Sequence, residues 1–574
     1  MDKQQKSYKQ TAAMACLLFM LVVSIAAWMT YQSVEGIWGM LSFVLVGILC
    51  ILPWIIPFFV GLVVGVLSLL KILTFDVYST ALQISRIEPS WMTHTWVTLM
   101  SITGFLLSLY LTFEIIMIMK GRKYQKKGID RDLALVNCQI FDGNPDSDVI
   151  TDGVILIRNR VQEKEIPGLI TAVGKASDID VPSGYEKIDL DSQFVIPGLI
   201  NAHCHLFSDG RPMKMVKMSE SAKERISKLL TLGIVKRIFK RRMIVNINNA
   251  LNAGVTTIRT MGDPEDLDLI IRDEVREGKI HGPRLLCAGK LIAPTGGHGG
   301  PVARTADGTL EITKAVREFV RKDVDLIKIS STGGVMDAKM IGEAGRPQMT
   351  VEEIEAACIE AHRGGVMVAT HCESTQGIRE ALAGGVDTIE HGADIPDELV
   401  EQFKNNPKAK RGYTCLIPTL AAGMGMATLP LEVTHITPMI LANGVIVQKE
   451  MIKGMRKAYQ TGIKFGVGTD AAVPFSTHYE VWKELKYFMK YSEMTAREAI
   501  SIATKDTAEI LGIEDITGTL EIGKSADIQV VDGNPLDDID TLGRVKKVIV
   551  SGTLLDKPHV TELKSQLKIT PIDM

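Results

Sequence analysis

Apolar and polar residues alternate in three different ways along the chain, and the first of these is a series of long apolar runs near its start. No charged residue occurs in 11–29 or in 36–70, and a further apolar run covers 96–119. As one helix, 36–70 would be roughly 50 Å long, whereas the hydrocarbon core of a bilayer is about 30 Å thick. We therefore predict a transmembrane region and basic linker over 1–128, with about four helices at 11–31, 36–52, 55–73 and 96–119.

Basic residues flank this region at both ends. Three lysines precede the first run within 1–10, and five Lys or Arg residues follow the last run within 120–127. An even number of spans places both clusters on one side of the membrane, which the positive-inside rule identifies as the cytoplasm. We expect a multi-pass membrane protein with membrane lipids as partners and the rest of the chain in the cytoplasm. Glu114, near the cytoplasmic end of the last run, is expected to reach the interface or Lys120.

The second pattern consists of short apolar segments of strand length, separated by Gly, Asp and Pro. Three of these segments follow the basic linker, and two more return near the end of the chain. Segments of this length between turn residues are typical of β-strands. We predict one small split β-sandwich domain from 129–196 and 506–574, with strands at Leu133–Ile140, Gly153–Arg158, Leu169–Val173, Ala526–Val531 and Val545–Val550.

The third pattern occupies 197–505, where a helix, a glycine, an apolar strand and a polar residue follow one another repeatedly. Three such strands are Val366–His371, Val386–His391 and Ile463–Asp470. Glycine ends a helix in the left-handed conformation, and continuous apolar runs are typical of buried parallel strands. This alternation predicts an α/β fold, either an open doubly wound sheet or a barrel. Because the polar residues close their strands, where barrels build active sites, we predict a (β/α)8 TIM-like barrel.

Composition narrows the possible functions only a little. The net charge of -3 gives no reason to expect nucleic acid as a partner. The eight cysteines form no Cys-x-x-Cys pair, which indicates reduced thiols rather than a disulfide framework. The sequence contains no Gly-x-Ser-x-Gly, P-loop or His-Glu-x-x-His motif, so serine-hydrolase and nucleotide-driven chemistry lack support.

Six residues in the barrel segment are candidate metal ligands. His203 and His205 lie two apart on one apolar strand, so their side chains point to the same face. Lys328 lies within another apolar run, where a buried cation is costly unless it is paired or chemically changed. Imidazole and carboxylate groups that meet at strand ends suit a divalent metal. The other candidates close further strands: His371, His391 and Asp470.

In barrel order these residues resemble the amidohydrolase superfamily, which has His-x-His on strand one, Lys on strand four, His on strands five and six, and Asp on strand eight. Within it, the chain is most similar to imidazolonepropionase-like hydrolases and to Xaa-Pro and Xaa-Arg/Lys dipeptidases. Some of these dipeptidases carry Tyr two residues after the strand-five histidine, where this chain has Glu373. The motifs that carry the resemblance are 197–205, 296–299, 327–328, 331–335, 361–364, 370–371, 389–392 and 468–470.

The resemblance implies a role for each candidate. Lys328 would be carboxylated and bridge two divalent metal ions, with Zn2+ as the expected metal. His203, His205 and Asp470 would hold the first ion, and His371 and His391 the second. Asp470 would also be the catalytic residue, acting as general base and then as general acid. His298, after a glycine-rich turn, would bind the carbonyl or carboxylate of the substrate, with a structural hydrogen bond as the alternative.

We therefore expect a membrane-anchored, metal-dependent amidohydrolase that cleaves an amide C–N bond by a metal-bridging hydroxide, in a dipeptide such as Xaa-Pro or in an N-acyl amino acid. One alternative is a cyclic amide or amidine hydrolase, or a deaminase, with one metal and an ion-paired Lys328. A second is a membrane transporter or sensor with a metal-binding barrel, and a third is an inactive binding module. A homo-oligomer is also left open.

A basic insertion follows the first barrel strand, over 213–242. It contains ten Lys or Arg residues and two acids, Glu220 and Glu224, interleaved with Leu, Ile and Phe. Because it follows a strand, it leaves from the active-site end of the barrel. A basic amphipathic helix can lie on an anionic membrane surface, which is one hypothesis for this segment. The alternative is a solvated helix that covers the site.

Overall fold

The computed structural model describes residues 131–160, 168–211, 225, 228–300, 303–563, 569 and 572. The chain divides into two compact units, Met1–Tyr124 and Gln125–Met574, and every described residue belongs to the second. The predicted transmembrane helices, the basic linker and Glu114 lie outside the described residues. Within those described ranges, no helix is both long enough and apolar enough to cross a membrane.

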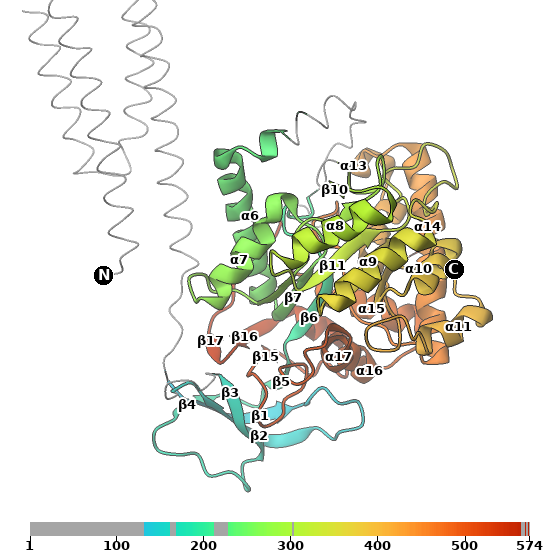
Figure 1. The fold of residues 1–574 in the computed structure, drawn as a ribbon. Helices are drawn as coiled ribbons and strands as arrows, with labels where there is room; N and C mark the ends of the chain where they lie inside the picture. The colour runs from blue at the N-terminus through green and yellow to red at the C-terminus, as the bar shows by residue number, and fades with distance from the viewer. Residues whose placement is uncertain are drawn as a thin grey trace, which may run out of the picture. The chain divides into compact units, whose positions relative to one another are not determined.

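Strands from both sides of the barrel segment join in one sheet. They are β1 (Leu133–Ile140), β2 (Ile150–Arg158), β3 (Leu169–Lys175), β4 (Glu186–Asp189), β5 (Phe194–Pro197), β15 (Ile528–Val531), β16 (Val545–Val550) and β17 (Thr553–Leu555). The eight-stranded sheet has the order β17-β16-β15-β5-β1-β2-β3, with β4 paired to β1 (Figure 1). β5 and β15 are antiparallel, with Pro197 opposite Ile528, so the two halves of this domain meet beside the first barrel strand.

Seven parallel strands form most of the barrel, whose (β/α) alternation is as predicted. They are β6 (Leu199–Cys204), β7 (Val255–Thr260), β8 (Arg284–Cys287), β11 (Leu326–Ser330), β12 (Met367–Cys372), β13 (Thr388–His391) and β14 (Cys415–Ile417). The short β9 (Ile292–Ala293) continues β8 toward β11, and it also pairs with β10 (Arg304–Thr305). The backbone N–H of Asp325 donates to the carbonyl of Cys287 at 2.9 Å and joins β8 to the start of β11.

The extended segment 463–471 completes the ring between β14 and β6. The N–H of Leu416 donates to the carbonyl of Lys464 at 3.0 Å, and the N–H of Ala202 donates to that of Val467 at 2.7 Å. The predicted strand Ile463–Asp470 is thus an extended segment held by single bridges. Position 468 requires glycine, because a Cβ there would lie 2.6 Å from Ile417 and 2.7 Å from His203.

Helices cover the outside of the barrel, and α8, α9 and α10 lie side by side there (Figure 1). Gly385 and Gly462 end α10 and α14 in the left-handed conformation, which is the role predicted for these glycines. α9 begins with a capping box between Thr350 and Glu353. The helices that surround the barrel are α6 (Gly233–Asn252), α7 (Leu267–Arg276), α8 (Gly308–Val320), α9 (Val351–Arg363), α10 (Thr375–Gly384), α11 (Asp397–Lys404), α12 (Leu420–Thr428), α13 (Leu431–Thr434), α14 (Pro438–Thr461), α15 (Val481–Ser492), α16 (Ala496–Ser501) and α17 (Thr507–Leu511).

Candidate active site

The predicted metal ligands come together at the carboxyl ends of the barrel strands. β6 carries His203, β12 carries His371 and β13 carries His391, and all three rings are buried. Their ring centroids lie 4.8 Å apart for His203 and His391, and 4.6 Å apart for His371 and His391. Apolar strands fold this way because their inner faces fill the barrel, which leaves their polar end residues around one space.

Asp470 connects His203, in β6, and His205, which directly follows that strand, to this group. Its Oδ1 lies 3.4 Å from Nε2 of His203 and 3.3 Å from Nε2 of His205. His203, His391 and Asp470 each offer one ligand atom, and these atoms all lie within 4.8 Å of one another. A set of imidazole nitrogens and a carboxylate at this spacing suits a divalent metal.

Three of the four histidines, His203, His205 and His391, are each held through Nδ1. Nδ1 of His203 lies 2.7 Å from Oε2 of Glu390, and Nδ1 of His205 lies 2.6 Å from the carbonyl of Gly262. Nδ1 of His391 lies 2.7 Å from Oγ1 of Thr419. Partners of this kind fix the orientation of an imidazole and leave its Nε2 directed at the metal position.

Glu390 and Arg259 are functional residues that the sequence analysis did not identify. Arg259 donates to Oε1 of Glu390 at 2.9 Å and to the carbonyl of Ala202 at 2.6 Å, and both side chains are buried. Burial alone would raise the pKa of Glu390, but Arg259 and His203 hold that pKa well below its usual range. Glu390 is therefore an anion that holds His203 in place. The available sequence signal was a charged residue inside each of two apolar strands.

Lys328 is buried within β11, and its Nζ has no hydrogen-bond partner among the residues that the structure describes. Burial lowers the pKa of Lys328 to about 8, although Glu390 and Asp470 oppose this shift. Oδ1 of Asp470 is likewise buried without a hydrogen bond. Two uncommitted polar atoms within a histidine cluster fit a metal site, because the amine can become a carbamate ligand only from its neutral form.

Burial also keeps the other two histidines neutral. It lowers the pKa values of His371 and His391 well below their usual range, with neighbouring histidines adding to the shift. Asp470 differs, because the neighbouring His203 and His205 overcome the effect of its burial and lower its pKa. Neutral imidazoles and an ionised carboxylate are the protonation states that bind metal.

His298, the predicted substrate-binding residue, lies at the edge of this cluster. Its ring stacks on that of His371, with centroids 4.0 Å apart and planes 13° apart. Its Nδ1 lies 2.5 Å from Oδ2 of Asp337. The position is compatible with contact to a substrate, and the pairing with Asp337 orients the ring.

Glu373 adds a buried carboxylate at the same edge. Its Oε1 lies 3.9 Å from Nε2 of His371, and its Oε2 is buried without a hydrogen bond. Burial raises the pKa of Glu373 to about 8, and the carboxylates of Asp470 and Asp337 add to this shift. Glu373 therefore lacks a cationic partner within the described part of the chain.

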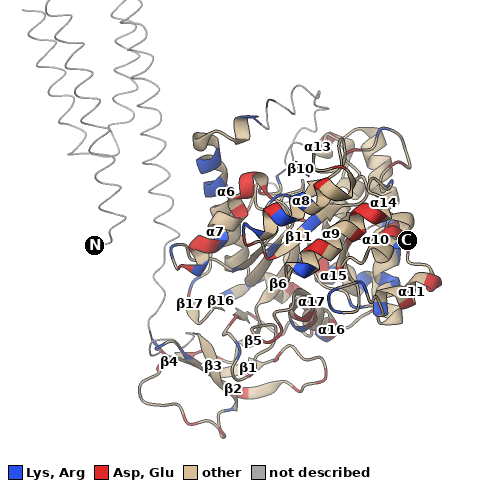
Figure 2. Cartoon of the chain, in the orientation of Figure 1, with Lys and Arg blue, Asp and Glu red and all other residues tan. Residues whose placement is uncertain are grey.

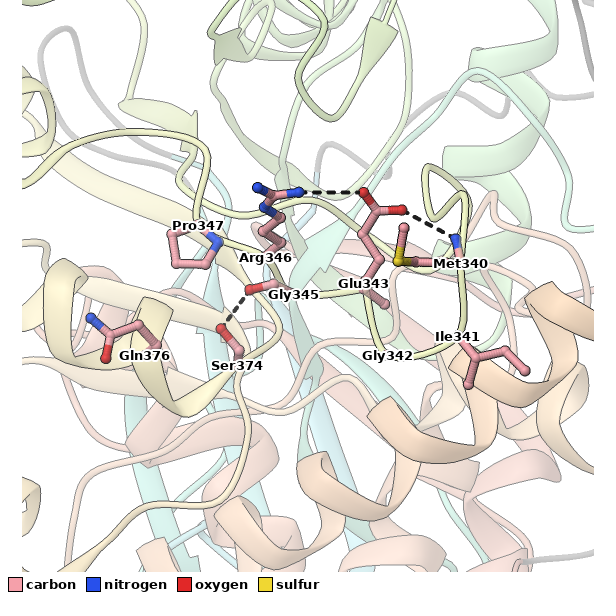
Figure 3. A pocket seen from close by; sticks show the side chains of 10 residues that line it. Met340, Ile341, Gly342, Glu343, Gly345, Arg346, Pro347, Ser374 and Gln376 are labelled. Carbon is pink, nitrogen blue, oxygen red and sulfur yellow. Dashed lines mark hydrogen bonds and ion pairs between the residues drawn. The ribbon is translucent and has the colours of Figure 1, made fainter.

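The loop after β11 contacts the backbone of Glu373 and lines an open hollow of about 390 Å³ (Figure 3). A Cβ on Gly345 would lie 2.3 Å from the carbonyl oxygen of Glu373, so the two backbones are in close contact. The hydroxyl of Ser374 donates to the carbonyl of Gly345 at 2.5 Å. Because Glu343 and Arg346 also line this hollow, it lies on the outer side of the loop.

Comparison with known proteins identifies this architecture. The model of the amidohydrolase family matches residues 194–555. The chain belongs to the amidohydrolase family. Among curated relatives, ochratoxinase from Aspergillus niger is 24% identical to this amidohydrolase over 410 residues, covering 66% of this chain and 79% of the relative. Imidazolonepropionase from Rhizobium rhizogenes is 24% identical over 409 residues, covering 69% and 90%.

Solved structures agree with this assignment. A candidate prolidase from Bifidobacterium longum is 36% identical, covers 76% of this amidohydrolase and 97% of its own chain, and has a TM-score of 0.66. A Xaa-Pro dipeptidase with bound methionine is 29% identical, covers 74% and 100%, and has a TM-score of 0.62. The predictions of a TIM-barrel fold and of a hydrolytic enzyme are confirmed: this amidohydrolase acts on carbon–nitrogen bonds.

Proposed function

We propose that this protein is a membrane-anchored, metal-dependent hydrolase that cleaves an amide bond in a dipeptide or an N-acyl amino acid. The observation that carries this proposal is the arrangement of four histidines and Asp470 at strand ends, together with the buried and unpartnered amine of Lys328. A binding module would not need this combination of neutral imidazoles with an ionised carboxylate.

His203, His205 and Asp470 would hold one divalent ion, His371 and His391 a second, and carboxylated Lys328 would bridge the pair. Zn2+ is the expected metal because the ligands are mainly imidazoles. When bound, such ions make water a hydroxide nucleophile near neutral pH and polarise the amide carbonyl. Glu390 and the carbonyl of Gly262 keep His203 and His205 oriented for this role.

The chain's own residues then manage the protons and the substrate. Asp470, ionised at the centre of the cluster, accepts a proton from the attacking water at a carboxylate oxygen and returns it to the leaving nitrogen. His298, oriented through Nδ1 by Asp337, presents its Nε2 to the carbonyl or carboxylate of the substrate.

Glu373 favours the dipeptide among the two substrate classes. A buried carboxylate is costly when one of its oxygens, here Oε2, has no hydrogen bond within the described residues, and a cation that binds beside it lowers that cost. The free ammonium group of a dipeptide supplies such a cation, whereas an N-acyl amino acid has none. Two of the similar structures are a candidate prolidase and a Xaa-Pro dipeptidase, which supports the same choice.

The first test is the metal content per chain of detergent-purified protein, for wild type and Lys328→Ala. We expect about two equivalents in wild type and a sharp loss in the variant. Loss of amide hydrolysis should accompany the loss of metal. One equivalent that is unaffected by the substitution would instead support the one-metal cyclic-amide hydrolase or deaminase, which imidazolonepropionase among the relatives exemplifies.

The anchor is proposed from the apolar runs over 1–128. We expect the protein to stay with membranes after an alkaline carbonate wash, which removes peripheral proteins. The catalytic domain should be open to protease only from the cytoplasmic side. Release by the wash, or protease access from the opposite side, would contradict the proposed topology.

A further inference from the structure

A corner of exposed apolar side chains lies at the start of α6. Leu229, Leu232, Ile234 and Ile238 are exposed by 52%, 48%, 48% and 41%. The described residues include twelve exposed large apolar side chains, and four of them fall within the ten positions 229–238. Apolar residues gathered in this way form a patch, unlike the single exposed residues that are normal on protein surfaces.

The first half of α6 projects beyond the core that holds its second half. None of the residues from Gly233 to Arg242 is buried, whereas Met243 and Ile247 are buried in the main hydrophobic core. Figure 1 shows this corner at the edge of the barrel domain. Packing within the domain therefore does not explain the four exposed apolar residues of 228–242, a segment that we name the α6 corner.

The α6 corner is also strongly basic. Residues 228–242 include six Lys or Arg residues and no acid, and their blue colour stands out on α6 in Figure 2. Glu265 pairs with both Lys236, at 2.6 Å, and Lys290, at 2.7 Å, so this cluster keeps a net positive charge. Lys240 pairs with Glu274 at 2.5 Å. The surface therefore combines apolar and cationic side chains.

The α6 corner lies at the end of the barrel that carries the metal ligands. α6 leads into the beginning of β7, so its own start lies at the opposite end, where the strands finish. Asn246 fixes it there, because its amide donates to the carbonyls of Leu206 and Ser208 at 2.8 and 2.7 Å. Those two carbonyls belong to the loop that follows His205.

We propose that the α6 corner docks on an anionic bilayer surface and turns the mouth of the barrel toward the membrane. The four apolar side chains enter the boundary between headgroups and acyl chains, and the basic side chains contact lipid phosphates. The inference rests on the proposed membrane anchor, because the thirteen residues of 120–132 can span at most about 45 Å between the last apolar run and β1.

The test uses the full chain in lipid vesicles, with an environment-sensitive fluorophore attached at Ile234→Cys. The matched control carries the same label at Ile522→Cys, because Ile522 is also apolar and exposed by 68% but lies in the split-sheet domain. Cys16 and Cys50 are replaced by Ala in both proteins, and the six described cysteines are buried. Lipids that carry a quencher near the headgroup report contact with the bilayer.

In vesicles with about 30% phosphatidylglycerol we expect quenching at position 234 to exceed that at position 522 by roughly threefold. Pure phosphatidylcholine, or Arg237→Gln with Arg242→Gln, should remove most of this difference. Equal quenching at both positions would overturn the proposal. The emission of the fluorophore at position 234 could also shift to the blue as protein concentration rises, and do so in detergent. This result would overturn the proposal, because it would show that the α6 corner contacts another copy of the chain.

Flotation of the same vesicles separates the two levels of failure. Protein that floats with the vesicles but shows no quenching at 234 keeps the proposed anchor and loses the docking surface. Protein that does not float with vesicles of either composition loses both. Leu232→Ser with Ile234→Ser should weaken quenching at position 238 without unfolding, because both side chains are about half exposed.

Discussion

The two halves of the candidate metal centre are held in different ways. In the first half, His203 and His205 each contact a fixed oxygen through Nδ1 and share Asp470 through Nε2. In the second half, Nδ1 of His391 contacts the hydroxyl of Thr419 at 2.7 Å, whereas His371 has a 3.4 Å contact to the carbonyl of Gly333 and a stacked His298 ring. The first half is thus held by an anion and a carbonyl, whereas in the second half His391 has a neutral partner and His371 is held less closely.

The largest expected effect comes from removing the charge that joins the first half. Asp470→Asn should lower kcat by about 10²–10⁴-fold, because the proton acceptor is lost. The metal content should fall by one ion rather than two if the halves are independent. Steady-state kinetics and elemental analysis measure both. Asp397→Asn, in an exposed pair on α11, is the control and should leave both values unchanged. Loss of both ions from Asp470→Asn would show that the halves bind metal as one unit.

A smaller effect is expected from the residue behind His203. Glu390→Gln keeps the shape of the side chain but removes the anion, and should weaken metal binding about 10–100-fold in a chelator titration. Thr419→Val removes the neutral partner of His391 and should cost less. Comparable losses in the two variants would mean that charge does not distinguish the halves. Thermal unfolding of the metal-free proteins serves as the control for misfolding.

The substrate side should respond to Glu373. Glu373→Gln should lower kcat/KM for a dipeptide about tenfold, since charge-assisted hydrogen bonds are roughly twice as strong as neutral ones. The N-acetylated dipeptide should change little, because it lacks the ammonium group. Glu343→Gln, on the outer side of the same loop, provides the matched control. An equal loss of kcat/KM for both substrates would mean that Glu373 acts on the metal centre rather than on the substrate amine.

The smallest expected effect is the pH dependence of metal loading. Lys328 has a pKa of about 8 in the folded protein, below its ordinary value of 10.5. Since only the neutral amine reacts with carbon dioxide, reactivation of metal-free protein by Zn2+ at a constant concentration of dissolved carbon dioxide should quicken about fivefold from pH 7 to pH 8. The unfolded state binds more protons between pH 8 and 10.5, so the stability of the metal-free protein should also rise there. A flat rate between pH 6 and 9 would argue against carboxylation.

The ligand set was accessible from sequence because each ligand occupies a position that local pattern defines. His203 and His205 lie two apart on a strand, and His371 and His391 close apolar runs. The pairing of Arg259 with Glu390 was not accessible, since 131 residues separate them and only the barrel register brings them together. Glu373 was noted from the sequence as a departure from relatives. The lack of a hydrogen bond to its Oε2 among the described residues could not be predicted, because it depends on packing against the loop at Gly345.

The irregular segment 463–471 shows the same limit. Its apolar run and its final Asp470 predicted a strand, and the chain does pass between β14 and β6 as expected. The close contacts of Gly466 and Gly468 with neighbouring side chains depend on residues far away in sequence. The split sheet was predictable only as strands, because its order depends on how β5 meets β15.

The pairing of β5 with β15 also bears on how the protein is made. β5 leads through Gly198 directly into β6, the strand that carries His203 and directly precedes His205. Its antiparallel neighbour β15 is synthesised only after the entire barrel segment. The β5–β15 pairing, which supports the start of β6, therefore forms last. Chains truncated before Ile528 should lack this support, so the binding site is completed only after β15 has been synthesised.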